Sequence, residues 1–303
     1  MAKLGDKLKQ ILVPLITPFE KGSQDVDYKM AEKLVEHLIA KNFCDTIIVA
    51  GTTGEFNTLS NEERIELFKV VKGAVKGRVP LVAGTGAAST RDAVKLTQEA
   101  EKLGYDAVMV VGPYYCKPSQ EGIYQHYATI AANTGIDMML YNIPIFTGMN
   151  ISPETVARLS KIKNIVGIKD EAGINPTQMT EYAGITPKDF TIYNGDDIMI
   201  LCGLVQGASG VVSGASHLIG DKIRKMINLF LDGKVAEARD IHMAIDPLFK
   251  AFCPNGRVNP MPVLRAAVEL TGLPIGSGRL PLDEATPEEK ENIKKHLVRL
   301  GVL

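Results

Sequence analysis

The sequence predicts an α/β protein built as a (β/α)8 TIM barrel with a C-terminal helical extension. Eight short apolar segments alternate with amphipathic, charged segments along most of the 303-residue chain. The apolar segments are almost continuously hydrophobic rather than alternating, which indicates a parallel sheet buried on both faces. Strand–helix units that repeat without a break in rhythm favour a closed barrel over an open doubly wound sheet.

The predicted strands are runs of aliphatic and β-branched residues, bounded by turn-forming or polar residues. We expect them at residues 11–17, 46–50, 80–83, 107–111, 137–141, 165–169, 191–193 and 209–213. The segments between them carry apolar residues three and four positions apart, as amphipathic helices do. Examples of these helices are 28–40, 61–75, 90–103, 120–133, 153–160 and 196–205.

Helix-capping residues support several of these boundaries. Ser60 and Ser89 each precede an expected helix and are followed three residues later by an acidic residue, and Ser152 precedes Pro153 at a plausible first helical position. Gly77 and Gly104 stand where helices are expected to end.

The pattern changes after a helical segment at 219–231. Three further helical segments follow at 235–251, 262–270 and 286–300, with no strand between them. We therefore expect a catalytic barrel over residues 1–232 and a helical appendage over residues 233–303.

Composition limits the partners of the protein. The 34 basic and 35 acidic residues give a net charge of −1, so we expect neither a nucleic acid nor a membrane surface as a partner. The mean hydropathy is +0.04, and no apolar run reaches the roughly 18 residues that span a bilayer. The N-terminus lacks the apolar core of a signal peptide. The four cysteines form no C-x-x-C pair, so we expect reduced thiols in a cytoplasmic protein.

The sequence carries no pattern for a metal or a nucleotide cofactor. None of the five histidines forms an H-x-H or H-x-x-x-H pair, which argues against a zinc-dependent aldolase. The Gly-rich fingerprints of dinucleotide and phosphate-binding loops are absent as well. We therefore expect no cofactor and no metal.

A lysine ends one of the predicted strands. TIM-barrel active sites lie at the C-terminal ends of the strands, and Lys169 closes the apolar segment 165–169. Burial disfavours the charged form of a lysine and yields the neutral amine that attacks a ketone. The alternative is an ion pair of Lys169 with Asp170 or Glu171 that has only a structural role. Position alone leaves both explanations open.

Hydroxyl groups follow three other strands. Thr52 and Thr53 come after the second strand, Tyr114 and Tyr115 after the fourth, and Tyr141 ends the fifth. A phenol hydrogen-bonded to a threonine can move the protons that an amine nucleophile requires. The backbone N–H groups of a Gly-Thr-Thr-Gly turn can hold a small carboxylate. Aromatic packing explains any single tyrosine equally well.

Taken together, these segments form a recognisable set. They are Gly51-Thr-Thr-Gly-Glu55, Pro113-Tyr-Tyr115, Tyr141-Asn-Ile-Pro144, Gly167-Ile-Lys169, Asn194-Gly-Asp-Asp197 and, near the C-terminus, Arg279-Leu-Pro-Leu282. The set resembles the dihydrodipicolinate synthase / N-acetylneuraminate lyase family of class I lyases, which act through a Schiff base with pyruvate. The resemblance covers essentially the whole chain.

The resemblance implies a role for each site residue. Lys169 would condense with the ketone of pyruvate or another 2-oxo acid, and Tyr141 would be the acid/base beside it. Thr52 would link Tyr141 to Tyr115 of a neighbouring subunit in a proton relay. Substrate-binding roles would fall to the Thr53 hydroxyl and backbone, to the Val212 carbonyl, and to the position held by Phe146. Family members are commonly homotetramers, each a dimer of dimers.

Phe146 is a departure from the synthase branch, to which the chain is otherwise most similar. Synthases usually carry an arginine there, which holds the carboxylate of aspartate semialdehyde. Phenylalanine cannot make that bidentate contact, whose loss costs on the order of 1.5–3 kcal/mol. Asp170 is also more typical of 2-keto-3-deoxygluconate aldolases. Phe56 and Ala88 stand where lysine-inhibited synthases usually have polar residues, so a lysine-feedback pocket is not expected.

Two enzymatic hypotheses follow from the resemblance. The first is a 4-hydroxy-tetrahydrodipicolinate (dihydrodipicolinate) synthase of lysine biosynthesis, which condenses pyruvate with aspartate semialdehyde. The alternative, favoured by Phe146, is an aldolase that splits a 2-keto-3-deoxy sugar acid into pyruvate and an aldehyde. A sugar-acid dehydratase or a hydroxy-oxo acid aldolase is a further enzymatic alternative with less support. A barrel kept only as a scaffold is disfavoured, because the complete set Lys169, Tyr141, Thr52 and Tyr115 is present.

Overall fold

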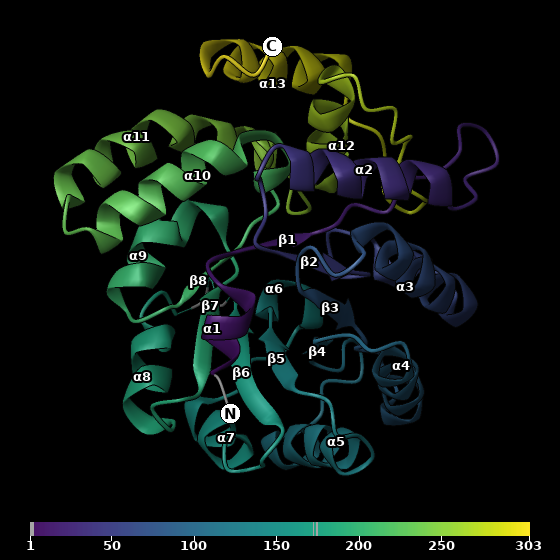
Figure 1. The fold of residues 1–303 in the computed structure, drawn as a ribbon, viewed down its shortest axis with the longest axis vertical. Coiled ribbons are helices and arrows are strands. Elements are labelled where there is room, and N and C mark those ends of the chain that lie inside the picture. The colour runs from purple at the N-terminus through teal and green to yellow at the C-terminus, as the bar shows by residue number, and fades with distance from the viewer. Residues whose placement is uncertain (1–2, 172, 174) are drawn as a thin grey trace.

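The protein folds as a closed barrel of parallel strands surrounded by helices (Figure 1). The structure is a computed structural model that describes residues 3–171, 173 and 175–303. Within these residues, neighbouring strands pair in sequence order and the eighth pairs back with the first. The strands are β1 (Ile11–Pro14), β2 (Thr46–Val49), β3 (Leu81–Gly84), β4 (Ala107–Val111), β5 (Met138–Asn142), β6 (Ile165–Asp170), β7 (Thr191–Asn194) and β8 (Gly210–Val212). The predicted TIM barrel is confirmed.

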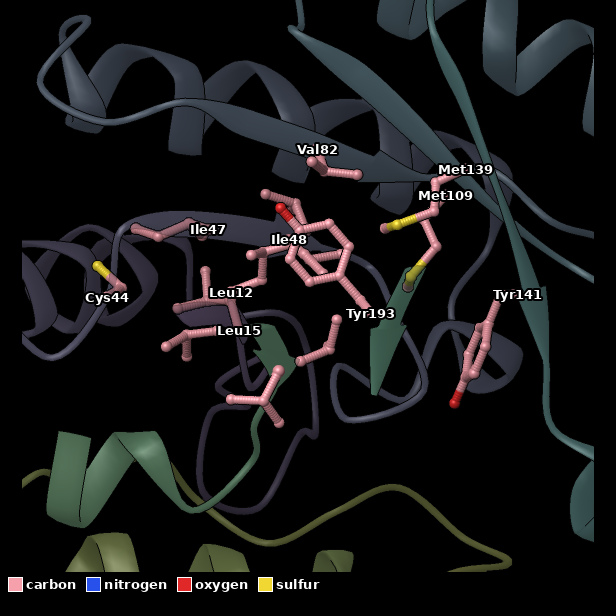
Figure 2. Close-up of a cluster of buried hydrophobic side chains, with 14 of the residues drawn as sticks. Leu12, Leu15, Cys44, Ile47, Ile48, Val82, Met109, Met139, Tyr141 and Tyr193 are labelled. Atoms are coloured by element: carbon pink, nitrogen blue, oxygen red, sulfur yellow. The ribbon is translucent and has the colours of Figure 1, made fainter. Parts of the chain in front are cut away.

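Strand side chains fill the interior of the barrel. Figure 2 shows part of this core, in which Leu12, Ile48, Met109 and Met139 gather around the ring of Tyr193. Each of these side chains is buried, as are nearly all residues of the eight strands. Because both faces of the sheet are covered, the strands read as continuous apolar runs.

Helices cover the outside of the barrel. They are α2 (Tyr28–Ala40), α3 (Asn61–Val75), α4 (Thr90–Lys102), α5 (Gln120–Ala132), α7 (Pro153–Leu159), α8 (Gln178–Ile185), α9 (Ile200–Val205) and α10 (Ser216–Leu231). Two short helices, α1 (Leu4–Leu8) and α6 (Pro144–Thr147), lie inside this ring, at the ends of the strands. The predicted caps are present: the Ser60 side chain accepts from the backbone N–H of Glu63, Ser89 from that of Asp92, and Ser152 from that of Thr155. These side chains satisfy backbone donors that have no partner within the helix.

The C-terminal helices gather on one side of the barrel (Figure 1). They are α11 (Val235–Ala251), α12 (Met261–Leu270) and α13 (Pro287–Arg299), with a short 3-10 turn at Pro254–Gly256. Helix α11 packs against α10, and α13 packs against α11 and α12. The predicted helical extension is therefore present. We propose that the boundary between barrel and appendage lies at residue 232, in the turn between α10 and α11.

Most predicted bounds agree with the structure to within one residue, but the first strand and the helix expected at 196–205 differ more. The first strand stops at Pro14 rather than residue 17, because the chain then turns toward the C-terminal region: the Thr17 carbonyl accepts from Arg265, and the Phe19 N–H donates to the Ile275 carbonyl. The expected helix 196–205 consists of a 3-10 turn at Asp197–Met199 followed by α9.

Candidate active site

A cavity of about 750 Å³ opens at the C-terminal ends of the strands. Six of the seven predicted site residues line it: Thr52, Thr53, Tyr141, Phe146, Lys169 and Val212. Its wall also contains Glu171, Asp196 and Asp197, together with residues of α11 and α12 from the C-terminal helices. The site is thus formed jointly by the barrel and the helical extension.

Lys169 lies near the end of β6 and is buried, with 5% of its surface exposed. Its Nζ lies 3.1 Å from Glu171 Oε2 and 3.9 Å from the centre of the Tyr141 ring. A Cβ at position 195 would come within 2.6 Å of the Lys169 Cε. Glycine at this position therefore leaves space for the lysine side chain. The amine therefore sits between a carboxylate and an aromatic face.

Tyr141 occupies the register position next to Lys169, on the neighbouring strand β5. Its hydroxyl donates to Glu171 Oε2 at 2.9 Å and accepts from Thr52 Oγ1 at 3.4 Å. Figure 2 shows this side chain apart from the main cluster, with its hydroxyl directed away from the barrel core. Burial, together with the nearby Glu171 carboxylate, raises the pKa of Tyr141 well above its usual value. The phenol therefore holds its proton at neutral pH.

Thr52 and Thr53 lie in the turn after β2, which is anchored from the C-terminal side. Glu55, at the end of this turn, forms a buried ion pair with Arg265 of α12 at 2.9 Å. Its other carboxylate oxygen accepts from the backbone N–H of Arg279 at 3.1 Å. This network connects the position of the two threonines to the packing of the extension.

Glu171 is a further functional candidate, which the sequence predicts only as a possible ion-pair partner of Lys169. A single oxygen, Oε2, contacts both Lys169 Nζ and the Tyr141 hydroxyl. Burial raises the pKa of Glu171, and the ammonium of Lys169 opposes that shift. In the sequence, the one indication of such a role for Glu171 is its position two residues after Lys169, which places both side chains on the same face of an extended segment. Asp170, by contrast, accepts a hydrogen bond from Asn142.

Two further carboxylates follow β7. Asp197 Oδ2 accepts from the Ala215 N–H at 2.9 Å, and burial raises the pKa of Asp197 to about 6. Its Oδ1 is buried and has no hydrogen-bond partner among the residues that the structure describes. Asp196 Oδ1 accepts from the Ile198 N–H at 3.1 Å. These oxygens give the β7 side of the cavity an acidic character.

The cavity wall after β5 is apolar at Phe146, the position that distinguishes the two enzymatic hypotheses. Phe146 lies in α6, directly after β5, and lines the cavity beside Ile145. Apart from Lys169, the lysine on the described cavity wall is Lys250 of α11, and its Nζ pairs with Asp246 at 2.7 Å. Val212, at the end of β8, completes the wall.

Tyr115 does not join the other predicted residues. It lies outside the cavity lining, its side chain is 92% exposed, and its backbone φ is +70°. A single chain thus brings Thr52 and Tyr141 together but leaves Tyr115 pointing into solvent. Within the described residues, no group of three metal-binding side chains occurs. None of the described helices is both long and apolar enough to cross a membrane.

The fold and the site define a class of protein: a TIM-barrel enzyme whose cavity is built around a buried lysine at the end of the sixth strand. Comparison with known proteins identifies the family. The chain belongs to the dihydrodipicolinate synthetase family (DHDPS), whose family model matches residues 7–300. The predicted family is confirmed, and with it the prediction of a class I, lysine Schiff-base lyase.

Known relatives match this chain over nearly its full length. The chain is 48% identical to the 4-hydroxy-tetrahydrodipicolinate synthase of Desulforudis audaxviator, over 94% of this chain and 95% of that protein. Among solved structures, the DHDPS of Cyanidioschyzon merolae with lysine bound is 41% identical, with a TM-score of 0.93 over 98% and 99% of the two chains. The chloride-inhibited dihydrodipicolinate synthase of Acinetobacter baumannii, complexed with pyruvate, is 33% identical, with a TM-score of 0.91 over 98% and 100%.

Proposed function

We propose that this enzyme condenses pyruvate with aspartate semialdehyde to form 4-hydroxy-tetrahydrodipicolinate, through an imine on Lys169. The observation that carries the proposal is the buried amine of Lys169, held at the cavity floor beside the Tyr141 hydroxyl and a proton-accepting carboxylate. The names of the relatives support the same reaction, and the Acinetobacter baumannii relative binds pyruvate.

The site residues then have definite roles. Lys169 Nζ attacks the ketone carbon of pyruvate, and Tyr141 passes protons to and from the reacting oxygen, with Thr52 hydrogen-bonded behind it. Thr53 binds the pyruvate carboxylate through its hydroxyl and backbone N–H, and the Val212 carbonyl faces the imine. Loss of a proton from the pyruvate methyl group gives an enamine, whose carbon attacks the aldehyde, and the new alkoxide takes up a proton. The amino group of aspartate semialdehyde then attacks the imine carbon, which closes the ring and releases the Lys169 amine.

The active form, in this proposal, is a homotetramer built as a dimer of dimers, in which Tyr115 of a neighbouring subunit completes the relay. A tyrosine that is 92% exposed with a positive φ fits a position that a second copy covers. We propose a cytoplasmic enzyme with small-molecule substrates and with neither a metal nor an organic cofactor, because the amine itself supplies the electrophilic activation of pyruvate.

Phe146 favours a second candidate, the cleavage of a 2-keto-3-deoxy sugar acid to pyruvate and an aldehyde. The ring gives the α6 side of the cavity an apolar wall, while Asp196 and Asp197 place oxygens on the β7 side. Hydroxyl groups of a sugar acid can donate to such oxygens, whereas a second carboxylate against Phe146 would be desolvated without a cation.

Steady-state assays with the two substrate sets separate the candidates. One assay measures condensation of pyruvate with aspartate semialdehyde, and the other measures pyruvate release from 2-keto-3-deoxygluconate, with kcat/KM as the readout. The main proposal predicts a higher kcat/KM for condensation. A preference for cleavage by tenfold or more would replace it with the second candidate.

A further inference from the structure

The carboxylate of Glu171 stands between the two groups that carry the proposed chemistry. Its Oε2 lies 3.1 Å from Lys169 Nζ and 2.9 Å from the Tyr141 hydroxyl. Thr52 donates to Tyr141, and Tyr141 donates to Glu171, so this chain of hydrogen bonds runs toward the carboxylate. The Glu171 side chain is 27% exposed and the Lys169 side chain 6%, so the contact lies at the cavity floor.

Imine formation needs a base at this place. An ammonium has no lone pair, so Lys169 must lose a proton before it can attack a ketone. Tyr141 is not a base at neutral pH, because burial keeps its hydroxyl protonated. Among the described residues, Glu171 is the carboxylate that pairs with Lys169, while Asp196 and Asp197 bind backbone N–H groups instead.

We propose that Glu171 is a catalytic acid–base residue that takes a proton from the Lys169 ammonium and returns it to the departing oxygen. The proposal rests on the proposed function, because it requires an imine on Lys169. If the ion pair had only a structural role and persisted throughout the reaction, the same contact would instead keep Lys169 charged and unreactive.

Every proton and electron pair is accounted for in the proposed imine formation. One ammonium N–H bond breaks, and its proton moves to Glu171 Oε2, leaving an amine and a carboxylic acid. The nitrogen lone pair forms the C–N bond as the carbonyl electron pair moves to oxygen, and a second nitrogen proton passes to that oxygen through Tyr141. Glu171 then gives its proton, again through Tyr141, to the hydroxyl. Water leaves, the nitrogen lone pair forms the C=N bond, and the products are a protonated imine, water and the original carboxylate.

The test measures how fast the imine forms, independently of the aldehyde substrate. Wild-type enzyme and Glu171→Gln are mixed with pyruvate for a series of times, quenched with borohydride, and the reduced adduct is counted by intact mass. The amide side chain of this variant keeps the size and a hydrogen-bond acceptor but cannot take the proton, so imine formation should be slower by about 100-fold or more at neutral pH. The matched control is Glu181→Gln, the same change at an exposed position on α8, which should retain the wild-type rate.

A pH series distinguishes this role from a purely structural one. The groups that face the Glu171 carboxylate are Lys169, Tyr141, Asp196, Asp197 and Cys253. The wild-type rate should fall as pH decreases through the raised pKa of Glu171, since the protonated acid cannot accept from Lys169. In Glu171→Gln the break in the pH profile at this pKa should disappear, and the rate should instead climb continuously with pH as solvent takes over the role of base.

Chemical rescue provides the second variant, and thermal unfolding confirms that each variant is folded. In Glu171→Ala, formate should restore imine formation by tenfold or more, because a small carboxylate fits the space of the removed one. The proposal would be overturned if Glu171→Gln formed the imine at the wild-type rate and with the wild-type pH dependence. It would also be overturned if Glu171→Ala formed the imine slowly, kept the wild-type pH profile and was not rescued by formate. If the wild-type enzyme itself forms no adduct on Lys169, the proposed function fails first and takes this inference with it.

Discussion

At the scale of single residues, the chemistry expected of the site depends on the burial of a few side chains that would be unreactive on a protein surface. Lys169 and Tyr141 are ordinary residues placed at strand ends, and the closed barrel buries both at the floor of one cavity. Burial stabilises the neutral phenol of Tyr141, and it holds the Lys169 amine away from bulk water.

Replacing Tyr141 by phenylalanine tests the proposed proton relay. The substitution removes the hydroxyl between Thr52 and Glu171 but keeps the ring that packs over Lys169. We expect the turnover number to fall by about two to three orders of magnitude, the usual scale for loss of an acid/base group, while pyruvate binding changes far less. An unchanged kcat in Tyr141→Phe would remove this hydroxyl from the chemistry.

Phe146→Arg tests the substrate assignment. A guanidinium at this position could form a bidentate contact with the carboxylate of aspartate semialdehyde, which the native ring cannot. The KM for aspartate semialdehyde should decrease more than tenfold, corresponding to about 1.4 kcal/mol. Phe146→Leu serves as the apolar control. If the wild type already has a micromolar KM for aspartate semialdehyde, another cation binds that carboxylate and the argument from Phe146 is wrong.

Much of the cavity lining could be predicted from the sequence, because each βα loop of a TIM barrel meets the others at one end. That topology turns scattered positions such as Thr52, Tyr141 and Lys169 into neighbours. The role of Glu171 was not predicted, since sequence alone presented it as an ion-pair partner like Asp170. Only the three-dimensional structure shows that one of its two oxygens, Oε2, contacts both the amine and the phenol.

At the scale of elements, the loop after β2, which carries Thr52 and Thr53, is anchored by residues far away in sequence. Arg265 of α12 binds Glu55 and the carbonyl oxygens of Thr17, Ile275 and Gly276. The network therefore joins the ends of β1 and β2 to the C-terminal extension. A buried ion pair of this kind is sensitive to loss of one partner, because the other charge is left buried and unpaired.

Arg265→Met should lower the free energy of unfolding by about 3–5 kcal/mol, as expected when a buried pair is broken from one side. The double variant Glu55→Gln/Arg265→Met should recover part of that loss, because no buried charge remains. Urea denaturation of the two variants and the wild type measures both effects. Equal stability of Arg265→Met and wild type would show that this pair does not anchor the loop.

Helices could be predicted from the sequence where the amphipathic pattern is long and capped, and not where it is short. Helices α2 and α3 match their predicted bounds because each has a polar cap and several turns of amphipathic sequence. The four-residue α6 and five-residue α1 were not predicted, since neither is long enough to establish a period of 3.6 residues. Of these, α6 carries Phe146, which lines the cavity.

At the scale of the whole molecule, one chain leaves the proposed relay incomplete. Tyr115 has a backbone conformation that costs a non-glycine residue about 1–2 kcal/mol, and its ring is almost fully exposed. In the proposed tetramer, a second subunit covers this ring, and the Tyr115 hydroxyl completes the relay beside the Thr52 of that neighbour.

A subunit-complementation experiment tests this arrangement. Tyr115→Phe and Tyr141→Phe should each be poorly active alone, yet a mixed dimer contains one site with both native hydroxyls. Random reassociation of the two variants should therefore restore about a quarter of wild-type activity, as two-fold symmetry requires. Sedimentation analysis should show a tetramer in every case. Absence of recovery, or a fully active monomer, would confine the chemistry to one chain.

The most direct test of the account is the identity of the residue that pyruvate modifies. The protein is incubated with pyruvate, reduced with borohydride and digested, and the adduct is located by peptide mass spectrometry. We predict irreversible inactivation with a single adduct on Lys169, since this amine lies buried at the cavity floor beside Tyr141 and Glu171. An adduct on another lysine, or full activity with no adduct, would contradict the proposed mechanism.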